Sequence, residues 1–242
     1  MKHFAGGRPR VEGTGPHHEW GSTNEYPTEG SLAEYHLPPF EAAVAAGTSS
    51  IMPYYATPVN GPSARQLPED LWHTEDQQFE EVAFAYNEHM LQDILREERG
   101  FEGYVNSDTG IIKDRIWGVE DLTLPERYAA AMAAGTNLFS GDGDTAALRQ
   151  ALEQGLVTVA EIEESLSFTL AEMFDLGLFE DPYVDPERPG DRRQRPVPGQ
   201  GRQGAPGLGR AAEEQRAGRR EGAADHRGPG RARQALRRGL HR

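Results

Sequence analysis

Side chains that could bind or transform a small molecule follow the strands that the sequence predicts. These are Lys2 and His3, Tyr54 and Tyr55, Ser107 and Asp108, and Ser140 to Asp142. In parallel α/β folds the ligand lies at the C-terminal ends of the strands. A carboxylate in that position can act as a nucleophile. This alignment singles out Asp108.

The elements that would position these side chains alternate between strands and helices. Short apolar runs predict strands at 49–55, 103–107 and 136–140. Apolar spacing predicts helices at 31–46, 76–99, 125–134, 145–154 and 159–176. Pro38 and Pro39 should kink or split the first helix, and a loop is predicted at 57–74. Alternation at this spacing indicates βαβ units and a parallel sheet.

Composition excludes several classes of protein. The 242 residues include no Cys, which rules out a disulfide scaffold, a thiolate metal site and a Cys nucleophile. No run reaches the roughly 18 to 20 apolar residues that span a bilayer. The N-terminus also lacks the pattern of a signal peptide. We expect no membrane partner, and the compartment stays unassigned.

The charge changes sign along the chain. Residues 1–189 carry 11 basic and 34 acidic side chains, whereas residues 190–242 carry 14 Arg, no Lys and 5 acidic side chains. The second part has no aromatic residue and few large aliphatic ones, too few to offset chain entropy. We therefore predict a partial domain at 1–188 and a disordered Arg/Gly/Pro-rich tail at 189–242.

The tail has three interpretations. Binding to nucleic acid is unlikely on its composition, because it has no aromatic residue for base stacking. A plain solvated extension is the second. The favoured third is translation of a GC-rich gene out of frame, since Arg, Gly, Ala and Pro without Lys, Ile, Phe or Tyr is its typical product.

Other residue clusters have an ordinary structural explanation. Adjacent side chains in 17–19, His-His-Glu, point in different directions, so a polar surface loop is favoured and no metal site is predicted. Trp117 lies in the loop after Asp108 and is a candidate platform for stacking on a sugar. Trp20 and Trp72 are expected to pack. The helix at 159–176 should carry its apolar residues on one side: Ile162, Leu166, Leu170, Met173 and Phe174.

Several ordered segments together resemble glycoside hydrolase family 3, in its β-glucosidase and β-xylosidase branch. They are Lys2–Gly7, His36–Phe40, Met52–Tyr55, Leu95–Glu98, Gly100–Asp108 and Gly177–Glu180. The resemblance runs from Lys2 to about Glu187. The ordered combination is much more specific than any one segment.

The resemblance implies an α/β fold of the (β/α)8, TIM-barrel type and a retaining glycosidase without a cofactor. Its substrate would be a β-glycoside or oligosaccharide with a terminal, non-reducing β-linked glucose or xylose. Asp108 would be the catalytic nucleophile, with Lys2 as a nearby cation. Lys2, His3 and Tyr55 would line the subsite of the cleaved sugar, with Trp117 as the stacking candidate.

Departures from the family pattern qualify these expectations. Thr109 stands where many members have an aromatic residue, and Asn137 replaces the usual acidic residue after Ala-Gly-Thr. The barrel strands that precede Lys2 in the family are expected to be missing. The general acid/base is also expected to be missing, because in family members it usually comes from a second domain after the barrel. A partial barrel leaves open sheet edges, which predicts self-association. The alternative is an inactive, truncated fragment that binds sugar weakly at most.

Overall fold

The computed structural model of the protein describes residues 1–7, 14–15 and 17–183. The chain divides into two compact units, Met1–Pro182 and Tyr183–Arg242. The helices and strands given below belong to the first unit. The predicted boundary between residues 188 and 189, and the predicted disordered tail, lie outside the described residues.

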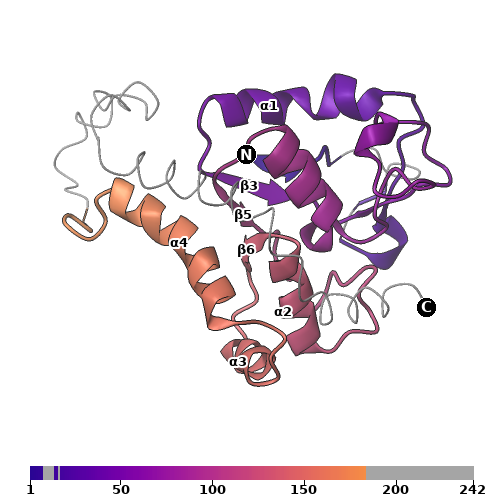
Figure 1. The fold of residues 1–242 in the computed structure, drawn as a ribbon. Helices are drawn as coiled ribbons and strands as arrows, with labels where there is room; N and C mark the ends of the chain where they lie inside the picture. Colours follow the sequence, from indigo (N-terminus) through magenta and orange to yellow (C-terminus); the bar gives the residue numbers. More distant parts are fainter. Residues whose placement is uncertain (8–13, 16, 184–242) are drawn as a thin grey trace, which may run out of the picture. The chain divides into compact units, whose positions relative to one another are not determined.

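A four-stranded parallel sheet organises the first unit (Figure 1). Its strands are β1 (Lys2–Phe4), β3 (Ser50–Pro53), β5 (Tyr104–Asn106) and β6 (Thr136–Leu138), in the order β1-β3-β5-β6. Ile51 stands opposite Val105, and Val105 stands opposite Thr136. The three predicted strands are confirmed, and β1 adds a fourth. Because the strands are parallel, their C-terminal ends lie at one edge of the sheet.

Helices connect the strands much as the apolar spacing predicts. They include α1 (Pro38–Ala45), α2 (Leu124–Ala133), α3 (Thr145–Glu153) and α4 (Val159–Asp175). The predicted break at Pro38 is confirmed, because a π-helix, η3 (Leu32–His36), ends just before α1. The N-terminus of α2 is fixed by Glu126, whose carboxylate accepts hydrogen bonds from both the main chain and the hydroxyl of Thr123.

The prediction of one long helix at 76–99 is wrong for the first half of that range. The helical segment is η6 (His89–Glu98), and residues 84–86 form only a short 3-10 turn, η5 (Phe84–Tyr86). The main chain before η6 bonds to other segments instead of to itself. The N–H of Phe79 donates to Asn60 Oδ1, and the N–H of Ala83 donates to the carbonyl of Trp117. The apolar residues here are buried by these distant contacts, which produced a helix-like spacing without a helix.

The predicted loop at 57–74 contains regular structure that the sequence does not announce. Strand β4 (Thr57–Pro58) pairs in parallel with β2 (Thr23–Asn24), and short 3-10 turns lie at η2 (Glu19–Gly21) and η4 (Glu69–Leu71). Strands of two residues are too short to carry an alternating pattern, so sequence periodicity cannot reveal them.

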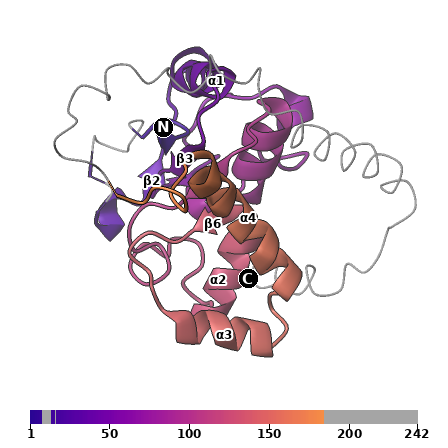
Figure 2. The ribbon, with the colours of Figure 1, turned by 90° about the vertical axis from the view of Figure 1, so that its left-hand side faces the viewer.

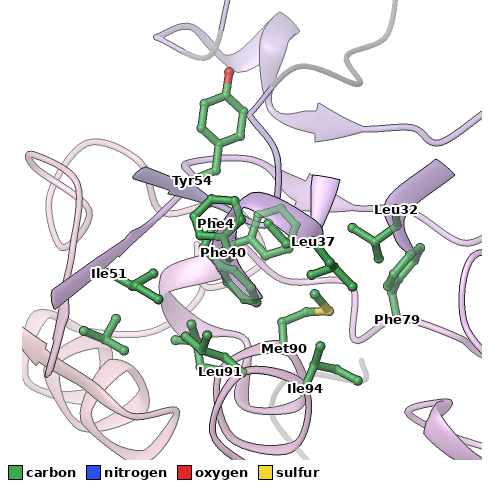
Figure 3. Packing of buried hydrophobic residues seen from close by; sticks show 14 of the residues in the cluster. Phe4, Leu32, Leu37, Phe40, Ile51, Tyr54, Phe79, Met90, Leu91 and Ile94 are labelled. Carbon is green, nitrogen blue, oxygen red and sulfur yellow. The ribbon is translucent and has the colours of Figure 1, made fainter. Parts of the chain in front are cut away.

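The core lies between the sheet and the helices η3, α1 and η6. Figure 3 shows Phe4 and Ile51, from the sheet, facing Met90, Leu91 and Ile94 of η6. Burial of these side chains removes apolar surface from water, at about 25 cal/mol per Å². This packing holds β1 and β3 in fixed positions, and those strands lead into the candidate site.

Helix α4 contacts β5 and β6. Both views place it beside β6 (Figure 1, Figure 2). On that side, the partly buried Ser165 donates to the carbonyl of Asn137 in β6, and the partly buried Phe168 packs against Arg96 of η6. Leu166, Leu170 and Phe174, which belong to the predicted apolar stripe, are exposed. The stripe is therefore not the surface by which α4 packs on the sheet. Self-association through open sheet edges stays a prediction.

Within the described part of the chain, no helix has both the length and the apolar character required to cross a bilayer. Over the same residues, no group of three or more His, Asp or Glu side chains is arranged to hold a metal ion.

The side chain of the buried Gln66 links several loop segments through hydrogen bonds. Its Oε1 accepts hydrogen bonds from the hydroxyl of Ser31 at 3.0 Å and from the N–H of Leu32 at 2.8 Å. Its Nε2 donates to the carbonyl of Thr28 at 2.8 Å and to that of Tyr26 at 3.2 Å. The hydroxyl of Tyr26 in turn donates to a carbonyl just after β1. Gln66 therefore satisfies polar groups that water cannot reach.

Replacing Gln66 with Leu should lower the free energy of unfolding by roughly 3 kcal/mol, because buried donors and acceptors lose their partners. The measurement is urea denaturation followed by circular dichroism. Gln150→Leu, on an exposed position of α3, is the matched control and should change stability by less than about 0.5 kcal/mol. Equal effects of the two substitutions would contradict the role assigned to Gln66.

Candidate active site

Asp108 follows β5 at the C-terminal edge of the sheet. Hydrogen bonding to β6 continues one residue past β5, because the N–H of Ser107 donates to the carbonyl of Leu138 at 2.8 Å. The N–H of Thr109 donates to Asp108 Oδ1 at 2.7 Å. This bond fixes one carboxylate oxygen and leaves the other directed toward the neighbouring strands. The Asp108 side chain is 17% exposed, so it is accessible but largely enclosed.

His3, on β1, meets Asp108 across the end of β3. Its Nε2 lies 3.2 Å from Asp108 Oδ2. Burial lowers the pKa of the imidazole below 6.5, and the nearby Lys2 ammonium and His17 lower it further, while the charge of Asp108 raises it. Burial is the largest of these effects. The neutral imidazole is therefore favoured near pH 7, and with its proton on Nε2 it donates to the carboxylate.

Tyr55, just beyond β3, forms the wall beside Asp108. Its hydroxyl donates to the carbonyl of Thr109 at 2.8 Å. Burial and the negative charge of Asp108 raise the pKa of Tyr55 to about 12, so the hydroxyl stays protonated. The guanidinium of Arg115 lies over the Tyr55 ring at 5.4 Å from its centre. Tyr55 is thus held from its hydroxyl and from its ring face.

Trp117 lies beneath this wall and offers little free surface. Its ring packs edge-on against Tyr55, with centroids 6.4 Å apart, and only 8% of the residue is exposed. The carbonyl of Trp117 accepts a hydrogen bond from Ala83. The geometry therefore favours a supporting role for Trp117 over the predicted platform for sugar stacking.

Lys2 is exposed at the start of β1. Its positive charge lowers the pKa of His3, which places it in the electrostatic surroundings of the site. Asp108 itself contacts the basic side chain of His3. The expected cation is therefore nearby, but it acts on the imidazole that contacts Asp108.

His17 is a site residue that sequence reasoning missed. It is exposed, as the predicted polar surface loop requires, and its ring lies edge-on to Tyr55 with centroids 5.7 Å apart. A single His in a loop rich in Gly and Pro has no spacing that could indicate its position. The neighbouring His18 stacks on Trp20, which is 65% exposed, so the expectation that Trp20 packs in the interior is wrong.

Three carboxylates near the site are already engaged in holding the surrounding loops. Asp142 Oδ2 accepts from the N–H of Ile112 at 3.0 Å, and burial raises the pKa of Asp142. Glu120 accepts from the N–H of Gly118 at 2.8 Å, and Asp114 lies 3.6 Å from Arg115. Each of the three carboxylates therefore already has a partner in the loops around the site.

The family model described as the glycosyl hydrolase family 3 N-terminal domain matches residues 1–170. Among curated relatives, probable β-glucosidase C of Aspergillus flavus is 39% identical over 199 residues, which cover 78% of this chain and 28% of that protein. The periplasmic β-glucosidase/β-xylosidase of Dickeya chrysanthemi is 31% identical over 210 residues, covering 79% and 30%. The chain thus spans less than a third of the length of these relatives.

Two solved structures with a similar fold are also β-glucosidases. A β-glucosidase from intestinal bacteria that is involved in saponin metabolism matches 80% of this chain and 23% of its own, with a TM-score of 0.59 and 25% identity. The β-glucosidase from Listeria innocua in complex with isofagomine matches 75% and 22%, with a TM-score of 0.56 and 25% identity. The described fold is a partial α/β barrel of the TIM type, and the chain belongs to glycosyl hydrolase family 3.

Proposed function

We propose that this chain carries the nucleophile half of a retaining β-glycosidase site that acts on a terminal β-linked glucose or xylose, with Asp108 as the nucleophile. The observation that carries the proposal is the contact between Asp108 and His3 at the C-terminal edge of the sheet. The family supports it further, because relatives are named as β-glucosidases and β-xylosidases.

The reaction would proceed in two displacements. A carboxylate oxygen of Asp108 attacks the anomeric carbon, the glycosidic C–O bond breaks, and the departing oxygen takes a proton from a general acid. The product is a glycosyl ester of Asp108. Water then attacks the same carbon, gives its proton to the general base, and releases the sugar and the carboxylate.

The surrounding groups prepare Asp108 for this attack. The bond from the N–H of Thr109 to Oδ1 orients the carboxylate and leaves Oδ2 beside His3. A neutral His3 and a protonated Tyr55 can both hydrogen-bond to sugar hydroxyls. Because the shifted pKa values of His3 and Tyr55 keep them uncharged near neutral pH, neither neutralises the nucleophile.

A retaining site also needs a second carboxyl group about 5 to 5.5 Å from the first. Asp114 and Glu120 contact groups in their own loop, and Asp142 accepts a hydrogen bond from Ile112 in the loop after Asp108. This favours a second candidate function for the isolated chain: a sugar-binding fragment that is inactive until a general acid/base is supplied from elsewhere.

Purified chain should hydrolyse a chromogenic aryl β-glucoside, whose good leaving group needs little protonation, and Asp108→Asn should reduce turnover by roughly a thousand-fold or more. Asp121→Asn, at an exposed position, is the matched control and should keep the rate. A 2-fluoro glucoside should leave a sugar mass on the peptide that contains Asp108. No turnover and no adduct would leave only the sugar-binding function.

The titration of His3 tests the site independently of turnover. By NMR, its pKa should lie below 6.5, and Asp108→Asn should lower it further because the carboxylate that favours imidazolium is lost. Between the folded pKa and 6.5 the unfolded chain binds more protons at this residue, so its contribution makes stability fall as pH falls through that window. A His3 pKa that does not respond to Asp108→Asn would contradict the contact.

A further inference from the structure

The side chain of Asn137 makes an unusual connection within the sheet. Its Oδ1 accepts a hydrogen bond from the main-chain N–H of Val105 at 2.8 Å. Asn137 lies in β6 and Val105 in the adjacent strand β5. The register between β5 and β6 shifts between Val105 and Asn106. A side-chain oxygen of β6 therefore takes a place in the ladder that a main-chain carbonyl would ordinarily fill.

The same oxygen also accepts a hydrogen bond from a partly buried cation, Arg96. Arg96 Nη2 donates to Asn137 Oδ1 at 3.2 Å, and Arg96 Nη1 donates to the carbonyl of Gly103 at 2.9 Å. The guanidinium lies between two aromatic rings, 5.3 Å from the centre of Phe101 and 5.2 Å from that of Phe168. Its planar fork can bridge two acceptors at once, which an ammonium group does less well.

These contacts act on the strand that carries Asp108. Gly103 lies directly before β5 and Val105 in its middle. On the opposite side, the N–H of Tyr104 donates to the carbonyl of Ser49, the residue directly before β3. Gly103 has no room to move toward β3, because even a Cβ there would overlap the carbonyl of Ser49. The position of β5 is therefore set on one side by β3 and on the other by Asn137 and Arg96.

We propose that Arg96 and Asn137, here called the β5 clamp, are positioning residues that fix β5 and thereby set where the Asp108 carboxylate lies beside His3. The proposal rests on the proposed function for the role of Asp108. The clamp touches neither the site nor the sugar and acts through the strand.

The acceptor oxygen is the part of Asn137 that matters. Its amide nitrogen has only a long contact, 3.5 Å, with the hydroxyl of Ser165. A carboxylate would keep both accepted hydrogen bonds and would pair with the guanidinium. Asn137→Asp should therefore preserve the clamp, Asn137→Leu should abolish it, and Ser165→Ala should leave it in place.

The experiment compares these three variants of the full chain with the unchanged chain. Asn137→Leu should reduce kcat on the aryl β-glucoside by roughly 10- to 100-fold with KM changed less than about two-fold, because a nucleophile displaced by a fraction of an ångström still allows binding. Its His3 pKa should fall, since the contact with Asp108 is lengthened. Asn137→Asp and Ser165→Ala should match the unchanged chain in both measurements.

An unaltered kcat and an unaltered His3 titration in Asn137→Leu would overturn the proposal. A loss in Asn137→Asp as large as in Asn137→Leu would also overturn it, since the acceptor would then be irrelevant. If Asn137→Leu does not fold, Arg96→Lys takes its place, and the same two results decide. If the unchanged chain shows no turnover, the proposed function fails, and the clamp is then judged by the His3 titration alone.

Discussion

The contact between His3 and Asp108 depends on one geometric constraint, the parallel register of three strands. Neighbouring strands lie about 4.8 Å apart, so β1 and β5, with β3 between them, are separated by roughly twice that distance. Two side chains can close such a gap only above the end of the middle strand. β3 ends at Pro53, and beyond it the ring of Tyr54 packs edge-on against His3. The order β1-β3-β5 thus sets where the imidazole and the carboxylate can meet.

The sequence predicts those parts of the fold in which local pattern and tertiary structure agree. The strands at 50–53 and 104–106 and the helices α2 and α3 bury or bond their own residues with a regular period. At 76–88 the pattern and the structure disagree, because the main chain bonds to Asn60 and Trp117, which are distant in sequence. No local period contains that information. The exposed stripe of α4 shows the converse, an amphipathic helix whose most apolar side is not the one against the sheet.

The candidate site was predictable to the same extent. Asp108 and Tyr55 follow strands of the parallel sheet that contains His3 in β1, so their meeting at one edge follows from topology, and the family resemblance suggests their roles. His17 reaches Tyr55 from a loop, and loops carry no period from which such an approach can be inferred. Trp117 was placed correctly in the rim but its surface was not, because the burial of a large ring depends on what packs above it, here Tyr55.

The way hydrogen bonds are distributed around Asp108 separates two tasks that a glycosidase must perform. The proposed nucleophile, Asp108, is contacted by the N–H of Thr109 and the imidazole of His3, and the strand before it is bonded to β3 and to Asn137. Donating a proton needs a carboxyl group with no such duties, free to exchange with the substrate oxygen. In the rim loops, the carboxylates of Asp142 and Glu120 accept main-chain N–H groups, so protonating either would weaken the loop that it holds. In the proposed mechanism, the groups that hold Asp108 in place therefore differ from the group that would have to supply the proton.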